Sequence, residues 1–137
     1  MVASPLEGGG GGGPSFAYTI GLSQTLAHPE LIMVGRDPYV CHTILNAAAI
    51  RIQEGERFVP PPGQDHILVA NLFGGGYTAA IKRLTREAKL EYLCQAAYLY
   101  GEAAFEALQI VMPDSHHRFP WDEGYDSQAM RGQVALY

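Results

Sequence analysis

Residues 16–22 carry the clearest pattern of bulky and small positions in the chain. Phe, Tyr, Ile and Leu occupy every second position there, and Ala, Thr and Gly lie between them. Because successive side chains of a strand point to opposite faces, this pattern predicts a strand with one bulky and one small face. Residues 31–34 are all apolar and are followed by Gly35, which predicts a second strand that is buried on both faces.

The period changes to that of a helix after residue 37. Asp37 is a good N-cap, Pro38 suits the first helical position, and Gly55 is placed to end the helix. A second helix is predicted between its cap, Thr85, and Gly101. Each helix has one apolar stripe at helical spacing. The stripes contain Cys41, Ile44, Leu45, Ala48 and Ile52 in the first helix, and Leu90, Leu93, Cys94 and Ala97 in the second.

Three further strands complete the predicted set of elements. Residues 66–73 and 77–84 flank three glycines, which predicts an antiparallel hairpin because glycine supplies the positive φ of such turns. Residues 59–63 are rich in proline and predict a rigid surface connector before the hairpin. Residues 105–112 are the fifth strand, and residues 113–137 predict an irregular tail with aromatic anchors.

The order of these elements, ββαββαβ, indicates the fold class. The short link of the hairpin allows only antiparallel pairing, because a parallel pair needs a long crossover connection. We therefore expect an α+β fold with a mostly antiparallel sheet of about five strands and two helices packed on one face. Residues 1–13 are expected to be a flexible glycine-rich lead-in, since ordering six consecutive glycines costs much backbone entropy. Residues 14–137 are expected to form a single α+β domain.

Composition narrows the classes of function. The net charge of −5 and the lack of a Lys/Arg cluster argue against nucleic acid and against a membrane surface, which both attract basic faces. No apolar run reaches the roughly 18 residues that span a bilayer, and the N-terminus lacks the pattern of a signal peptide, so a cytoplasmic protein is expected. Charged residues make up only 17% of the chain, which favours self-association into a homodimer.

His28 and Glu30 lie one residue apart just before the second strand, where core packing does not require them. Imidazole exchanges a proton near neutral pH, and a neighbouring carboxylate can fix its tautomer. His28 and Glu30 are therefore the candidate catalytic residues. The alternative is structural, with both side chains capping the turn and bonding to loop backbone.

Tyr18, Trp121 and Asp122 are the candidate ligand-binding residues. Tyr18 belongs to the bulky face of its strand, as a core aromatic or as a proton donor. Trp121 follows a rigid proline and precedes Asp122, so this loop is suited to close over a pocket with an apolar wall and a polar anchor. The alternative is a tail that is attached to the body of the domain by burial of its aromatic rings.

Neither a metal nor a cofactor is predicted. Adjacent histidines, and the adjacent Cys–His pair, point their side chains apart, so a metal would need distant ligands such as His28 and Asp122. Cys41 and Cys94 lie on apolar helix stripes and are expected to be reduced, buried thiols. The glycine run precedes a strand and lacks the Lys-Ser/Thr ending of a phosphate-binding loop.

Several short motifs occur in an order that resembles a known bacterial family. They are FAYTIGL (16–22), HPEL (28–31), ILN (44–46), GERF (55–58), LQIVMPD (108–114) and RFPWD (118–122). Together they resemble the family catalogued as domain of unknown function 4262, over residues 16–126. The chain departs from the family at its glycine-rich start and at Met112, where tryptophan is common. The resemblance supports the predicted fold and implies no activity.

Two functions from different classes follow from these observations. In the first, a pocket between the His28 loop and the Trp121 loop binds a small organic molecule, with acid–base chemistry at His28. In the second, the domain is a protein-interaction or regulatory module without catalytic activity, and its low charge and eight tyrosines supply an apolar surface for a homo-oligomer. The polar groups in the two loops favour the first.

Overall fold

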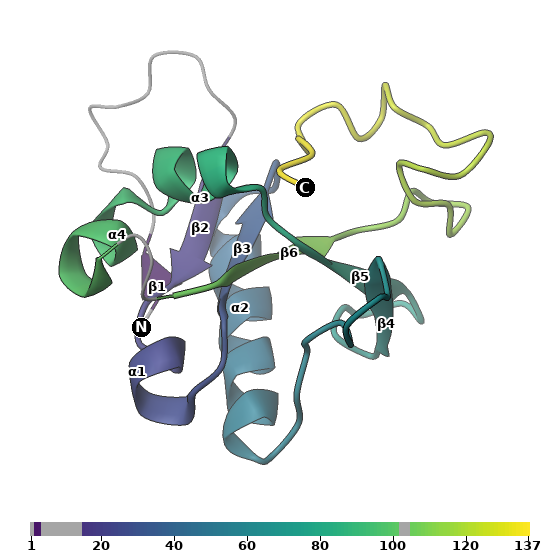
Figure 1. The fold of residues 1–137 in the computed structure, drawn as a ribbon. Coiled ribbons are helices and arrows are strands. Elements are labelled where there is room, and N and C mark those ends of the chain that lie inside the picture. Colours follow the sequence, from purple (N-terminus) through teal and green to yellow (C-terminus); the bar gives the residue numbers. More distant parts are fainter. Residues whose placement is uncertain (1, 4–14, 102–104) are drawn as a thin grey trace.

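The computed structural model describes residues 2–3, 15–101 and 105–137. A central sheet with helices on either side makes up most of the molecule, and the last 25 residues form a long irregular tail (Figure 1). The tail agrees with the prediction for this segment. Of residues 1–13, which were expected to form the flexible lead-in, Val2 and Ala3 form a short strand, and the others lie outside the described residues.

The sheet combines antiparallel pairs with one parallel pair at its centre. Its strand order is β1-β2-β3-β6-β5-β4, and β3 runs parallel to β6 while the other neighbouring pairs run antiparallel. The predicted α+β class, with a mostly antiparallel sheet, is therefore confirmed. The strands are β1 (Val2–Ala3), β2 (Phe16–Thr19), β3 (Glu30–Val34), β4 (His66–Ala70), β5 (Thr78–Arg83) and β6 (Ala107–Val111).

The helices begin where the capping residues predicted. The Asp37 carboxylate accepts the N–H of Tyr39 at 2.8 Å at the start of the long helix α2, and the Thr85 hydroxyl accepts the N–H of Ala88 at 3.1 Å. The second predicted helix is divided at Leu93, which leaves the helical conformation and is completely buried. The helices are α1 (Leu22–Leu26), α2 (Pro38–Gln53), α3 (Arg86–Tyr92) and α4 (Cys94–Tyr100).

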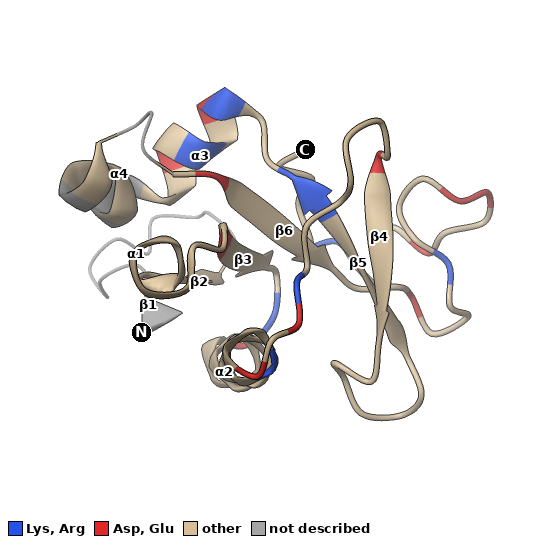
Figure 2. Ribbon diagram, turned by 60° about the horizontal axis from the view of Figure 1, so that its bottom comes forward, with Lys and Arg blue, Asp and Glu red and all other residues tan. Residues whose placement is uncertain are grey.

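The main helices lie on opposite faces of the sheet, whereas the sequence analysis placed both on one face. Figure 2 shows α2 on one side of the strands and α3 on the other. Alternate residues of β3 explain the division: Leu31 and Met33 pack in the cluster around α2, and Ile32 and Val34 pack in the cluster around α3 and α4. A strand that is apolar at every position needs cover on both faces, so one helix layer cannot bury it.

Two glutamine side chains attach the tail to β6. The Gln109 amide accepts the N–H of Leu136 at 2.9 Å and donates to the carbonyl of Val134 at 2.8 Å. The Gln133 amide bonds in the same reciprocal way to the N–H and carbonyl of Met112, at 2.8 and 2.9 Å. Each side-chain amide therefore takes the place of a backbone amide beside the strand.

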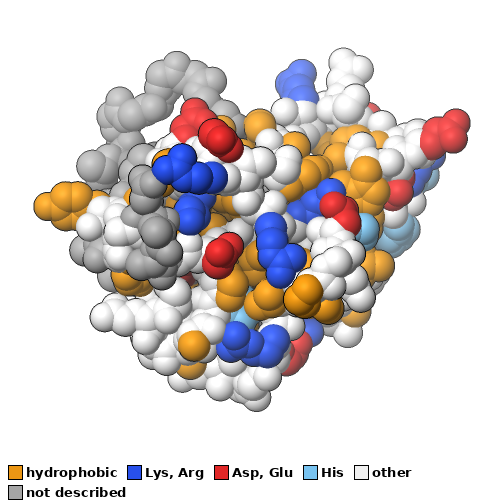
Figure 3. Space-filling view, in the orientation of Figure 1, with side chains coloured by type: hydrophobic (Ala, Val, Ile, Leu, Met, Phe, Trp, Pro, Cys, Tyr) orange, Lys and Arg blue, Asp and Glu red, His pale blue; other side chains and the backbone are white. Residues whose placement is uncertain are grey.

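The surface and the helices can also be compared with the expectations from charge and hydropathy. On the face drawn in Figure 3, acidic and basic side chains are interspersed with hydrophobic ones and form no large basic patch. None of the helices in the described part of the chain has the length and apolar character that crossing a bilayer requires.

Gly35 and Gly132 bring β3 and the tail into close backbone contact, and this contact yields a prediction. Gly35 has φ +97°, and a Cβ added there would lie 2.2 Å from the carbonyl carbon and oxygen of Gly132. Gly35→Ala therefore combines backbone strain with a clash. We expect it to lower the free energy of unfolding in urea by about 3 kcal/mol or more.

Gly55→Ala is the matched control for this substitution. Gly55 has φ +108°, but an added Cβ there meets nothing within 4 Å. It should therefore lose only the strain of a left-handed residue, about 1–2 kcal/mol. Equal losses in the two variants would contradict the argument that Gly35 is required for the tail to dock.

Candidate functional site

His28 is buried, and both of its ring nitrogens have backbone partners. Nδ1 lies 2.8 Å from the carbonyl oxygen of Pro29, and Nε2 accepts the N–H of Phe58 at 3.0 Å. Because a carbonyl can only accept, the proton belongs on Nδ1. Burial is the main cause that lowers the pKa of His28, so the imidazole is neutral at neutral pH. The geometry matches the capping alternative and leaves no ring nitrogen free for proton transfer.

Glu30 is completely buried and ties β2, α1 and β3 together. Its Oε1 accepts the Thr19 hydroxyl at 2.7 Å and the N–H of Leu22 at 3.3 Å. Its Oε2 accepts the N–H of Gly21 at 3.2 Å, and from Ser23 the N–H at 3.1 Å and the hydroxyl at 2.9 Å. The carboxylate therefore caps the first turn of α1, whose N–H groups have no partners within the helix.

Trp121 is part of an aromatic cluster that fixes the tail to the far end of the sheet. Its ring stacks on Phe119 with centroids 5.2 Å apart, and the ammonium group of Lys82 lies 4.4 Å from its centre. The same ammonium group lies 4.3 Å from the ring centre of Tyr137 and 2.8 Å from the carboxylate of Asp65. These contacts are those of a tail attached by its aromatic rings.

Tyr18 and Asp122 also have structural contacts. Tyr18 is buried in the cluster around α3 and α4, where its ring stacks on Phe16 with centroids 6.3 Å apart. The Asp122 carboxylate accepts the N–H of Phe119 at 2.8 Å within its own turn.

The His28 loop and the Trp121 loop lie on opposite faces of the sheet. His28 packs against Phe58 of the cluster around α2, whereas Trp121 packs against Phe119, which covers Ala80 on the other face. Figure 1 shows α1, next to His28, at the lower left and the tail at the upper right. The structure therefore does not bring these two loops together around one cavity.

A groove lies between α2 and the loop after β4, and we call it the α2 groove. Its volume is about 330 Å³. Tyr39, 79% exposed, lies at its rim, and Met112 forms part of its wall. The full lining comprises Tyr39, Val40, Thr43, Ile44, Ala47, Leu72, Phe73, Gly74 and Met112.

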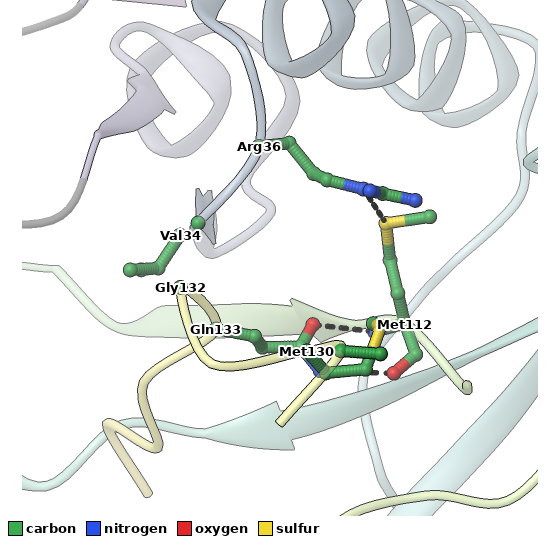
Figure 4. A pocket seen from close by; sticks show the side chains of 8 residues that line it. Val34, Arg36, Met112, Met130, Gly132 and Gln133 are labelled. Atoms are coloured by element: carbon green, nitrogen blue, oxygen red, sulfur yellow. Dashed lines mark hydrogen bonds between the residues drawn. The ribbon is translucent and has the colours of Figure 1, made fainter. Parts of the chain in front are cut away.

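The parallel pairing of β3 and β6 brings Arg36 next to Met112, which lines this groove. Parallel strands end at the same edge of a sheet, so the residues that follow Val34 and Val111 meet there. Nε of Arg36 donates to Sδ of Met112 at 3.3 Å, as Figure 4 shows. Gln133 holds the backbone of the same methionine, and a second cavity of about 30 Å³ lies behind it.

The lining of the α2 groove is mostly apolar. Its lining has no carboxylate, imidazole or amine, and its side-chain hydroxyl groups are those of Tyr39 and Thr43. Cys41 is completely buried in α2, and burial raises the pKa of its thiol, which is unsuited to nucleophilic attack. No three His, Cys, Asp or Glu side chains of the described residues gather closely enough to hold a metal.

Sequence reasoning missed the α2 groove, although a signal was present. Tyr39, Val40 and Ala47 lie on α2 outside the stripe that faces the core. Apolar residues on a second face of a helix indicate a second contact surface. The position of Met112 was not available from this pattern, because the pairing of β3 with β6 brings it there.

The buried imidazole predicts how stability depends on pH. The folded pKa of His28 lies below its ordinary value of 6.5, so the unfolded chain binds the proton more tightly. The stabilisation is therefore fully present above that value and is lost as the pH falls below it. We expect the free energy of unfolding to decrease from about pH 7 to about pH 5.5.

His28→Gln removes this titration and two backbone contacts. The variant should be less stable by roughly 1–3 kcal/mol at neutral pH, and its stability should vary less over the same pH range. His42→Gln, which replaces a half-buried imidazole on α2, is the control and should keep the slope of the wild type. Asp114 acts only at lower pH: burial opposes the shift, but three backbone N–H groups and Arg118 lower its pKa to about 2. An unchanged slope in His28→Gln would show that other groups cause the pH dependence.

Comparison with known proteins identifies the family and nothing closer. No curated protein and no solved structure matches the chain. A family model described as Domain of unknown function (DUF4262) matches residues 4–126, which is most of the sequence and includes β2 through β6 and the Trp121 turn. The match covers far more than half of the sequence and agrees with the order of the motifs, so the chain belongs to the DUF4262 family.

Proposed function

We propose that this domain binds a small, largely apolar organic molecule in the α2 groove. The observation that carries the proposal is the groove itself, whose volume of about 330 Å³ and lining of aliphatic and aromatic side chains fit such a ligand. Small-molecule sites in proteins commonly have volumes of about 300–1,000 Å³ and mostly apolar walls. The expected cytoplasmic location is kept as part of this proposal.

The proposal moves the ligand away from the pocket expected between the His28 and Trp121 loops. His28 and Glu30 have protein partners for all of their polar atoms, so they offer no group to a ligand without breaking those bonds. The α2 groove is lined mostly by apolar side chains. The hydroxyl group of Thr43, which also lines it, donates to the carbonyl of Tyr39 in the same helix. We therefore propose binding without acid–base catalysis.

Filling the groove tests this function. N-phenylnaphthylamine, an uncharged probe that fluoresces in apolar surroundings, should bind the wild type saturably. Ala47→Leu adds bulk inside the groove on a partly exposed helical position, so probe affinity should fall about tenfold, since the probe loses apolar contact area.

Asn46→Leu is the matched control. Asn46 is exposed on the same helix, one residue away, and does not line the groove. This variant should bind the probe as the wild type does. Absence of saturable binding to the wild type, or equal affinity in Ala47→Leu and Asn46→Leu, would refute the proposed site.

A homodimer formed through β4 is the second candidate function. β4 is an edge strand, and its five residues, His66–Ala70, contain no lysine, arginine or proline. Natural edge strands usually carry such residues, which prevent pairing with another chain. Leu68, at the centre of β4, is 59% exposed. Antiparallel pairing about Leu68 would place Ile67 of one copy opposite Val69 of the other, without opposed like charges.

Sedimentation velocity over a range of concentrations tests the dimer. The average mass of the wild type should rise with concentration, and Leu68→Lys should stay monomeric because a charge at the centre of the edge blocks pairing. Ile50→Lys places the same charge on an exposed apolar position of α2 and should behave as the wild type does. A wild type that is monomeric throughout, or a Leu68→Lys variant that still dimerises, would exclude this edge as the interface.

A further inference from the structure

We propose that the ligand of the α2 groove is an organic anion, with an apolar body in the groove and an acidic head group bound by Arg36. This inference rests on the proposed function and names the class of ligand. The acidic group would be a carboxylate or sulfonate of a freely diffusing small molecule, since the groove has room for one such body.

Arg36 lines the small second cavity and reaches the α2 groove through Met112, which lines both cavities. Its Nε donates a hydrogen bond to Sδ of Met112, a residue that lines the groove. The side chain is exposed, and neither terminal nitrogen has a hydrogen bond or ion pair with any of the described residues. A guanidinium group offers its donors in a planar fork that matches the two oxygens of a carboxylate.

The contact with Met112 fixes where the guanidinium group lies. Figure 4 shows the Arg36 side chain extending from the end of β3 across to the sulfur atom of Met112. The methionine is itself 8% exposed, and Gln133 bonds both to its N–H and to its carbonyl. The positive charge is therefore held next to Met112 in the apolar wall, on a side chain that is exposed as a whole.

The surrounding charges favour an anion over a cation. The nine residues of the lining are uncharged, and the guanidinium group of Arg36 contacts one of them, Met112. Asp37, its acidic neighbour in the chain, uses Oδ1 to accept the N–H of Tyr39 as the cap of α2. The net charge of −5 on the whole chain repels an anion at long range. Attraction of an anion to the groove must therefore come from a nearby positive charge such as that of Arg36.

Two probes that differ in one charged group test this inference. Anilinonaphthalene sulfonate has the ring system of N-phenylnaphthylamine with an added sulfonate. Arg36→Gln should weaken binding of the sulfonate about fivefold, the size expected for an exposed charge, and leave the neutral probe unchanged. Arg36→Lys keeps the charge without the fork and should retain most of the sulfonate affinity.

Arg86→Gln is the control for a change in net charge. Arg86 is exposed on α3, across the sheet from α2, so its loss should not alter the ratio of the two affinities. Added salt should weaken binding of the sulfonate to the wild type and reduce the effect of Arg36→Gln.

The outcomes separate the two proposals. If both probes bind and Arg36→Gln weakens neither or weakens both equally, the anion inference is overturned while the groove remains a binding site. If neither probe binds to the wild type, the proposed function fails, and the inference fails with it. A selective loss of sulfonate affinity in Arg36→Gln that Arg86→Gln does not reproduce supports the inference.

Discussion

Parallel pairing of β3 with β6 is the constraint on which the rest of this structure depends. The two strands are buried at every position and lie at the centre of the sheet. A parallel pair requires a long connection, and here that connection contains α2, the β4–β5 hairpin, α3 and α4. The same pairing forces apolar cover onto both faces and brings the carboxyl ends of both strands to one edge, where Arg36 meets Met112.

Buried polar groups elsewhere in the domain serve the fold. Glu30 receives five hydrogen bonds from residues 19–23, and His28 has a backbone partner at each nitrogen. An unpaired charge or imidazole in such surroundings would be costly, so each is surrounded by donors or acceptors of its own chain. The polar residues near the start of β3 therefore have structural roles: Glu30 caps α1, and His28 binds the backbone of Phe58.

The sequence was informative wherever the determining interactions are local. Asp37 and Thr85 marked helix starts because their partners lie two and three residues away, and the glycines after β4 marked a hairpin. The sequence was uninformative where a residue's role depends on contacts with distant segments of the chain. The capping role of His28 depends on Phe58, thirty residues later. The α2 groove depends on Met112, which reaches α2 only through the sheet. The division of helices between faces also required the strand order, which composition and periodicity do not contain.

The two glutamines that hold the tail have a consequence for the proposed site. The N–H of Met112 donates to a side chain of the last few residues of the chain and not to a neighbouring strand. Local opening of the tail would therefore release the wall of the α2 groove while the sheet stayed intact, as happens when a weakly held segment opens on its own. The C-terminal residues would therefore be a remote part of the proposed site, because Gln133 holds the backbone of Met112 in place.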